Sequence, residues 1–207
     1  MMVAMTFSGT RTATAMIVFG VIFFAFMTMY QLRTLIATGV FVLGILAILF
    51  GPFYGPTFSR VRSTFEVKDD ESLGVRDRTR LRMQPYARTH PVGGGLNTTG
   101  RLGLKYEPDH ELAGDWDTDS GYLKTALERG WIGLVVQLGF YAVVLIFGIV
   151  HCFRSRDPWK QTYFIAYMAA FFALSIANYT QDSMDQKPVN IILVSSFAIL
   201  IRLSLLP

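Results

Sequence analysis

The sequence predicts an all-α membrane protein, a polytopic helical bundle with one long extracytoplasmic loop. Of its 207 residues, 52% are hydrophobic and only 16% are charged, whereas about a quarter of the residues in a soluble domain are charged. The charges are also unevenly placed, because long stretches contain none. Such stretches must form helices in lipid, since the bilayer offers no hydrogen-bond partner to an exposed backbone.

Five apolar stretches are the expected membrane spans. A helix needs roughly 20 apolar residues to cross a hydrocarbon core of about 30 Å, and four charge-free stretches have about that length: residues 12–30, 35–53, 130–150 and 161–178. A fifth stretch, residues 189–206, is interrupted by Arg202, whose long side chain can reach the interface. The chain is thus expected to divide into two transmembrane helices (1–53), a large loop (54–129) and three transmembrane helices (130–207).

The short links between spans predict the orientation. Residues 31–34 and 151–160 carry more Lys and Arg than Asp and Glu, whereas residues 179–187 carry more Asp. Because positive short loops stay in the cytoplasm, the first two links are expected inside and the third outside. The large loop then lies outside as well. The net charge of +4 is read as a mark of this topology, and no nucleic-acid partner is expected.

The large loop is expected to fold. It contains equal numbers of basic and acidic residues, unlike the one-sided charge that is typical of disorder. Residues 72–83 are expected to form a helix that Pro85 limits. The run Gly93-Gly94-Gly95 predicts a tight turn or a close approach of the backbone. Either Asp119 or Ser120 is expected to cap an amphipathic helix that leads into the third span.

Alternating arginines stand out in this loop. They are Arg76, Arg78, Arg80 and Arg82, and on a helix the first and third share a face. Their guanidinium forks suit a lipid-linked phosphate or pyrophosphate. On the spacing alone, an ordinary solvated helix, or arginines attracted to anionic headgroups, is the favoured interpretation. Arg11, at the outer edge of the first span, has the position of an interfacial anchor.

Other residue types narrow the chemistry. Several carboxylates between residues 109 and 119 offer a general base for a sugar hydroxyl, but no spacing defines the opposed pair of a glycosidase. His90 and His110 lack the spacing of metal ligands, so no metal is expected. No lysine follows Gly93-Gly94-Gly95 as a phosphate-binding loop requires, and no cofactor is expected. The single Cys152 excludes an internal disulfide.

Four segments together carry a family resemblance. They are residues 6–13 (TFSGTRTA); residues 72–76 (SLGVR) with 91–95 (PVGGG); residues 119–123 (DSGYL) with 128–134 (ERGWIGL); and the basic link with the two closing spans. In this order they resemble the O-antigen ligase and O-antigen polymerase family of bacterial membrane glycosyltransferases. The resemblance implies a helical membrane fold of the GT-C type. It also implies transfer of a glycan from an undecaprenyl-pyrophosphate carrier to an acceptor at the periplasmic face of the inner membrane.

The resemblance also implies roles for individual residues. Arg11 and Arg76 would bind the pyrophosphate of the polyprenyl-linked donor, with Arg80, Gly93 and Gly95 as supporting residues. Asp119 occupies the position where the family's ligases usually have a histidine. There it would orient or deprotonate a hydroxyl of the acceptor, a saccharide or lipid A–core. Membrane lipid is the remaining expected partner, and neither metal nor cofactor is implied.

Departures from the family pattern leave alternatives open. The aspartate at position 119 favours the polymerase-like relatives over a lipid A ligase, and Arg80 replaces an aromatic residue. Family members carry further spans before the segment 6–13, so the chain resembles their C-terminal part and an N-terminal half is an expected partner. The alternative is a non-catalytic membrane fragment or partner subunit. A transporter is less favoured, because the first four spans lack a central carboxylate or base.

Overall fold

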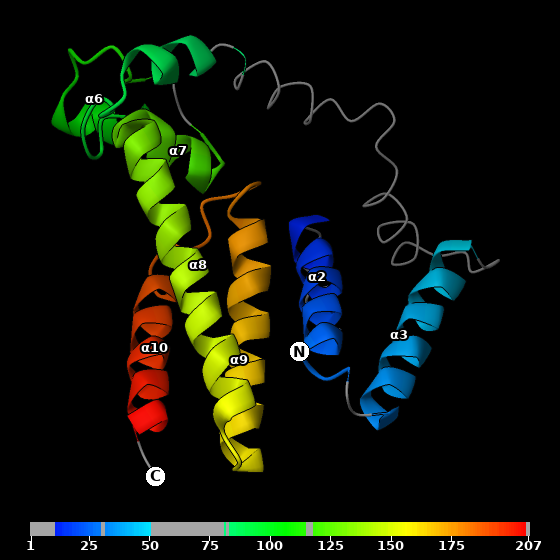
Figure 1. Cartoon of the computed structure of the whole chain (residues 1–207). Helices are drawn as coiled ribbons and strands as arrows, with labels where there is room; N and C mark the ends of the chain where they lie inside the picture. Colours follow the sequence, from blue (N-terminus) through cyan, green and yellow to red (C-terminus); the bar gives the residue numbers. More distant parts are fainter. Residues whose placement is uncertain (1–10, 30–31, 51–80, 82, 115–117, 206–207) are drawn as a thin grey trace. The chain divides into compact units, whose positions relative to one another are not determined.

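The computed structural model describes residues 11–29, 32–50, 81, 83–114 and 118–205 (Figure 1). The helices within these ranges are α2 (Arg11–Met27), α3 (Leu32–Phe50), α6 (Gly100–Tyr106), α7 (Gly121–Glu128), α8 (Gly130–Arg154), α9 (Pro158–Ala177) and α10 (Val189–Leu205). Residues 83–89 are also helical. An isolated bridge between Gly100 and Ala113 is the nearest approach to a strand in this part of the chain. The all-α prediction is therefore confirmed for the residues described.

Each expected span coincides with a helix: α2, α3, α8, α9 and α10. By length and composition, α8 is the one helix in the described ranges that qualifies to cross a membrane. Only 11% of its most apolar window is buried, whereas the core helix of a soluble protein is mostly buried. Residues 16–27 and α10 are apolar but shorter. A bundle of five spans, and a long loop outside the membrane, remain predictions.

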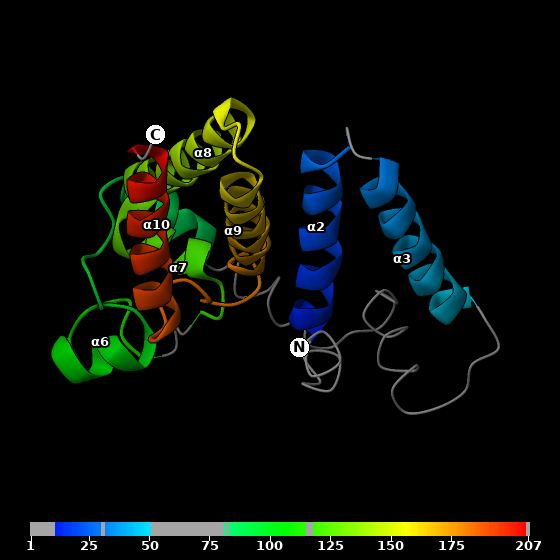
Figure 2. The same cartoon turned by 90° about the horizontal axis from the view of Figure 1, so that it is seen from below.

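The chain divides into two compact units, and the first comprises residues 1–68, 145–177 and 188–207. In this unit α2 lies between α3 and α9, as Figures 1 and 2 both show. The ring of Phe23 stacks on that of Phe172 with centroids 4.7 Å apart. The hydroxyl of Tyr167 donates to the carbonyl of Leu193 at 3.0 Å, which joins α9 to α10.

The second unit comprises residues 69–144 and 178–187. Its core is a cluster of four buried side chains, Met83, Tyr86, Leu112 and Leu127. The prediction that Pro85 limits the preceding helix is wrong, because residues 83–89 are helical on both sides of it. A proline inside a helix costs about 3 kcal/mol, but each fully buried apolar side chain contributes about 1.5–3 kcal/mol. Burial of Met83 and Tyr86 therefore outweighs the cost.

The glycine run forms the close backbone contact that its sequence predicts. The amides of Gly94 and Gly95 donate to the carbonyls of Leu127 and Glu128, both at 2.9 Å. These carbonyls belong to the last turn of α7, where a helix leaves acceptors unsatisfied. A Cβ on Gly93 would lie 2.5 Å from the carbonyl oxygen of Glu128. Only glycine lets the turn dock here, and the docking fixes where α7 ends and α8 begins.

Candidate functional site

A site is built around the first turn of α7. Ser120 is the N-cap, since its side-chain oxygen accepts from the amide of Leu123 at 3.4 Å; of the two predicted caps, it is the one the structure selects. The amide of Gly121 donates to the carbonyl of Asn178 at 3.0 Å. The side chain of Asn178 lies so close that a Cβ on Gly121 would clash with it. The segment Asp119-Ser120-Gly121 is thereby held against residues 178–187, which are distant in sequence.

Two further contacts order residues 178–187. The side-chain carbonyl of Asn178, which is 1% exposed, accepts from the amide of Ser183 at 3.2 Å. The ammonium of Lys124 donates to Oδ2 of Asp182 at 3.0 Å, with both side chains mostly buried. Burial alone would lower the pKa of Lys124, but its hydrogen bond and charge interaction with Asp182, helped by the Glu128 charge, raise that pKa above its ordinary value. Lys124 is therefore a fixed cation at the site.

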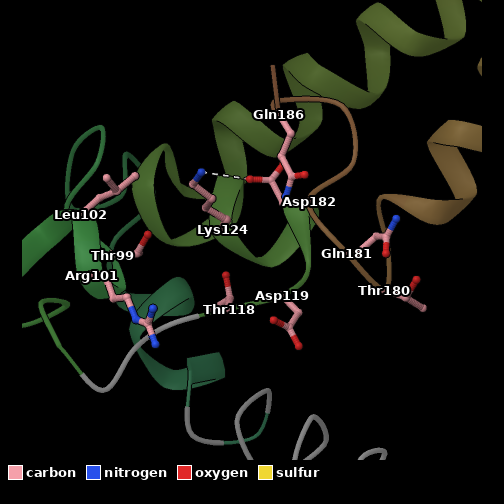
Figure 3. Close-up of a pocket in the computed structure, with 10 residues that line it drawn as sticks. All are labelled: Thr99, Arg101, Leu102, Thr118, Asp119, Lys124, Thr180, Gln181, Asp182 and Gln186. Atoms are coloured by element: carbon pink, nitrogen blue, oxygen red, sulfur yellow. Dashed lines mark hydrogen bonds and ion pairs between the residues drawn. The ribbon is translucent and has the colours of Figure 1, made fainter. Parts of the chain in front are cut away.

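These elements enclose a polar pocket of about 520 Å³, drawn in Figure 3. Its wall comes from the start of α6, the segment before α7, α7 itself and residues 178–187. The lining residues are Thr99, Arg101, Leu102, Thr118, Asp119, Lys124, Thr180, Gln181, Asp182 and Gln186. All but one are polar, and they offer hydroxyls, amides, carboxylates and two cations. Such a lining suits a ligand with many hydrogen-bonding groups.

Two lining residues carry a buried oxygen that lacks a hydrogen-bond partner within the described part of the chain. They are Oγ1 of Thr118 and Oδ1 of Asp182. Buried polar groups are almost always paired, since leaving one unpaired costs about 1–3 kcal/mol. Both residues line the pocket.

A buried polar contact joins two of the helices that line the pocket. The hydroxyl of Thr99 donates to Oε1 of Glu128 at 2.7 Å, and both residues are buried. Thr99 is the N-cap residue of α6, and Glu128 is the last residue of α7. The contact therefore ties together the two helices that contribute Arg101 and Lys124.

Of the residues singled out from the sequence, Asp119 lies in the pocket wall. Arg11 is the first residue of α2, in the other unit, and its side chain lies outside the described part. Arg76 and Arg80 lie outside the described residues altogether. Gly93 and Gly95 belong to the turn that docks on α7, so packing is enough to account for both glycines.

Sequence reasoning missed the residues that accompany Asp119, chiefly Arg101, Lys124 and Asp182. Arg101 carried no pattern that distinguished it from other loop arginines. For the other two a usable indication existed. The acidic link 179–187 and the large loop were expected on the same side of the membrane, so an ion pair between their charged residues could have been proposed.

The family comparison covers most of this region. The family model described as O-antigen ligase matches residues 1–138, which include Arg101, Asp119 and Lys124. No curated protein and no solved structure matches the chain.

Proposed function

Because the chain belongs to the O-antigen ligase family, we propose that it is a membrane glycosyltransferase acting on lipid-linked glycan. The family is membrane-associated and ligase-like. Our proposal adds that the donor is glycan on undecaprenyl pyrophosphate, and that transfer or polymerisation takes place at the periplasmic face of the bacterial inner membrane. The observation that carries it is that Asp119 lines the same polar pocket as the cation Lys124, which Asp182 holds in place.

The exposed surface of α8 supports a membrane location. Large apolar side chains such as Val136, Phe140, Val143 and Phe153 are more than half exposed. A helix that is apolar all round and yet uncovered by its own chain needs lipid or another protein around it. With α2, α3, α9 and α10 at the other expected positions, the protein would cross the bilayer five times.

The pocket is proposed as the acceptor site. Its volume of about 520 Å³ falls within the roughly 300–1,000 Å³ of small-molecule sites. Sugar hydroxyls both donate and accept hydrogen bonds, and the lining threonines, glutamines and carboxylates answer both needs. The acceptor is a saccharide, either the growing glycan or the lipid A–core.

The proposed reaction uses Asp119 as the base. The acceptor oxygen attacks the anomeric carbon of the donor, the bond from that carbon to the pyrophosphate oxygen breaks, and Asp119 takes the hydroxyl proton. General-base catalysis of this kind contributes roughly 10²–10⁴-fold. Undecaprenyl pyrophosphate leaves, and Arg11 and Arg76 stabilise its negative charge. Arg80 supports this donor site.

Complementation in a host that lacks the gene tests the proposal. Cells would carry the native chain, Asp119→Asn, Arg76→Ala or the control Asp109→Asn, at equal membrane levels. Asp109 is the matched control because it is an exposed carboxylate outside the pocket. We expect cells with Asp119→Asn or Arg76→Ala to accumulate untransferred or unpolymerised lipid-linked glycan, while cells with the control variant have the glycan profile of the native chain.

The outcomes separate the rival functions. If Asp119→Asn alone matches the native glycan profile, Asp119 is not the base. If all variants match it, and removing the chain leaves the profile unchanged as well, the protein is a non-catalytic membrane fragment or partner subunit.

A further inference from the structure

A second pocket, of about 600 Å³, lies in the first unit. It is formed where α8 ends, α9 begins and α10 ends, and Figures 1 and 2 show these termini at the same end of the three helices. Its lining includes Arg154, Arg156, Lys160, Phe164 and Leu203. None of these residues takes part in the proposed transfer reaction.

The pocket carries an excess of positive charge. Its lining contains three cations and one carboxylate, that of Asp157. This carboxylate caps α9, because its Oδ1 accepts from the amide of Trp159 at 2.9 Å. Pro158 occupies the first helical position, where proline is common. Arg154 and Arg156 are exposed, and neither has an ion-pair partner among the residues that the structure describes. Their guanidinium groups are available to an anion.

The lining of the pocket also includes two apolar side chains. Phe164 is 1% exposed and Leu203 is partly buried. The lining therefore combines cations at the link between α8 and α9 with apolar side chains from α9 and α10. A free phosphate would gain nothing from the apolar side chains, whereas a phospholipid has its phosphate next to its glycerol and acyl chains.

We propose that this pocket binds the phosphate headgroup of an anionic phospholipid. Arginine forks bind phosphate oxygens in pairs, and basic pockets between membrane helices on the cytoplasmic side are suited to anionic headgroups. The link between α8 and α9 is one of the two whose charge predicts a cytoplasmic position. The lipid fixes the closing helices at the cytoplasmic leaflet.

Native mass spectrometry of the purified chain in detergent tests the site. The chain would be titrated with phosphatidylglycerol, with phosphatidylcholine and with inorganic phosphate. The double variant R154Q/R156Q removes two charges from the pocket. The control K187Q/R202Q removes two from exposed positions outside it.

We expect R154Q/R156Q to bind phosphatidylglycerol about 25-fold more weakly, since each cation contributes about a fivefold effect. The control should bind it as the native chain does, and phosphatidylcholine should bind weakly to all three proteins. If both double variants bind phosphatidylglycerol more weakly by the same factor, the binding reflects general charge attraction and the proposed site is overturned. Displacement of the lipid by equimolar inorganic phosphate would overturn the lipid assignment.

If the variant R154Q/R156Q does not insert into the membrane, a second variant tests whether the pocket binds the lipid. R154K/R156K keeps both charges but loses the forked contacts. Weaker binding of phosphatidylglycerol with the preference over phosphatidylcholine retained supports the site, and unchanged binding overturns the role of the guanidinium forks.

Discussion

Gly130→Ala should strongly destabilise the second unit. Gly130 has a φ of +67°, and a Cβ at this position would collide with the carbonyl of Pro91. The left-handed conformation costs an alanine about 1–2 kcal/mol. Relief of the collision moves the glycine turn, and with it the two hydrogen bonds from Gly94 and Gly95 to α7, worth about 1 kcal/mol each. The free energy of unfolding should therefore fall by about 3–4 kcal/mol.

Gly139→Ala is the matched control, because Gly139 lies in the same helix and a Cβ there meets nothing within 4 Å. Alanine favours a helix over glycine by about 1 kcal/mol, so the control should be neutral or slightly stabilising. Equilibrium unfolding of both variants in mixed micelles, followed by circular dichroism, measures the difference. If Gly130→Ala is as stable as Gly139→Ala, the turn does not dock on α7 in the way described, and the position of Asp119 loses its support.

Two further predictions concern the pocket. Thr99→Val should destabilise the protein by about 1.5–3 kcal/mol, because it removes the hydrogen bond that the Thr99 hydroxyl donates to the buried Glu128 carboxylate. Thr89→Val, at an exposed hydroxyl, should change the free energy of unfolding little in the same assay. Equal effects of the two substitutions would contradict the stabilising role of the contact between Thr99 and Glu128. Lys124→Met should destabilise the protein at neutral pH. Folding raises the pKa of Lys124. The free energy of unfolding by which the native chain exceeds Lys124→Met should therefore be largest below the unfolded pKa of about 10.4, and it should shrink as the pH rises through the folded pKa. Unfolding of both proteins measured between pH 8 and 12 checks this, and a stability difference that grows with pH would refute it.

The positions of the helices could be predicted from the sequence. Charge-free stretches located α2, α3, α8, α9 and α10 to within a few residues, since the length of an apolar run is a local property. Ser120 as a cap and the glycine run as a close contact were equally local. The family resemblance rested on short ordered segments, and the family match confirmed it. The arginine segment around Arg76 lies outside the described residues, so its role remains a prediction.

Tertiary structure alone decided the composition of the pocket. Lys124 and Asp182 are 58 residues apart, and Thr99 and Glu128 are 29 apart. Neither pair shares a helical repeat or a turn, so no periodicity links them. The helical state of Pro85 was likewise decided by burial of its neighbours in a core assembled from distant segments. Local patterns set where each helix starts and stops, whereas the partners of a side chain depend on packing between helices, which a single sequence does not encode in any short-range pattern.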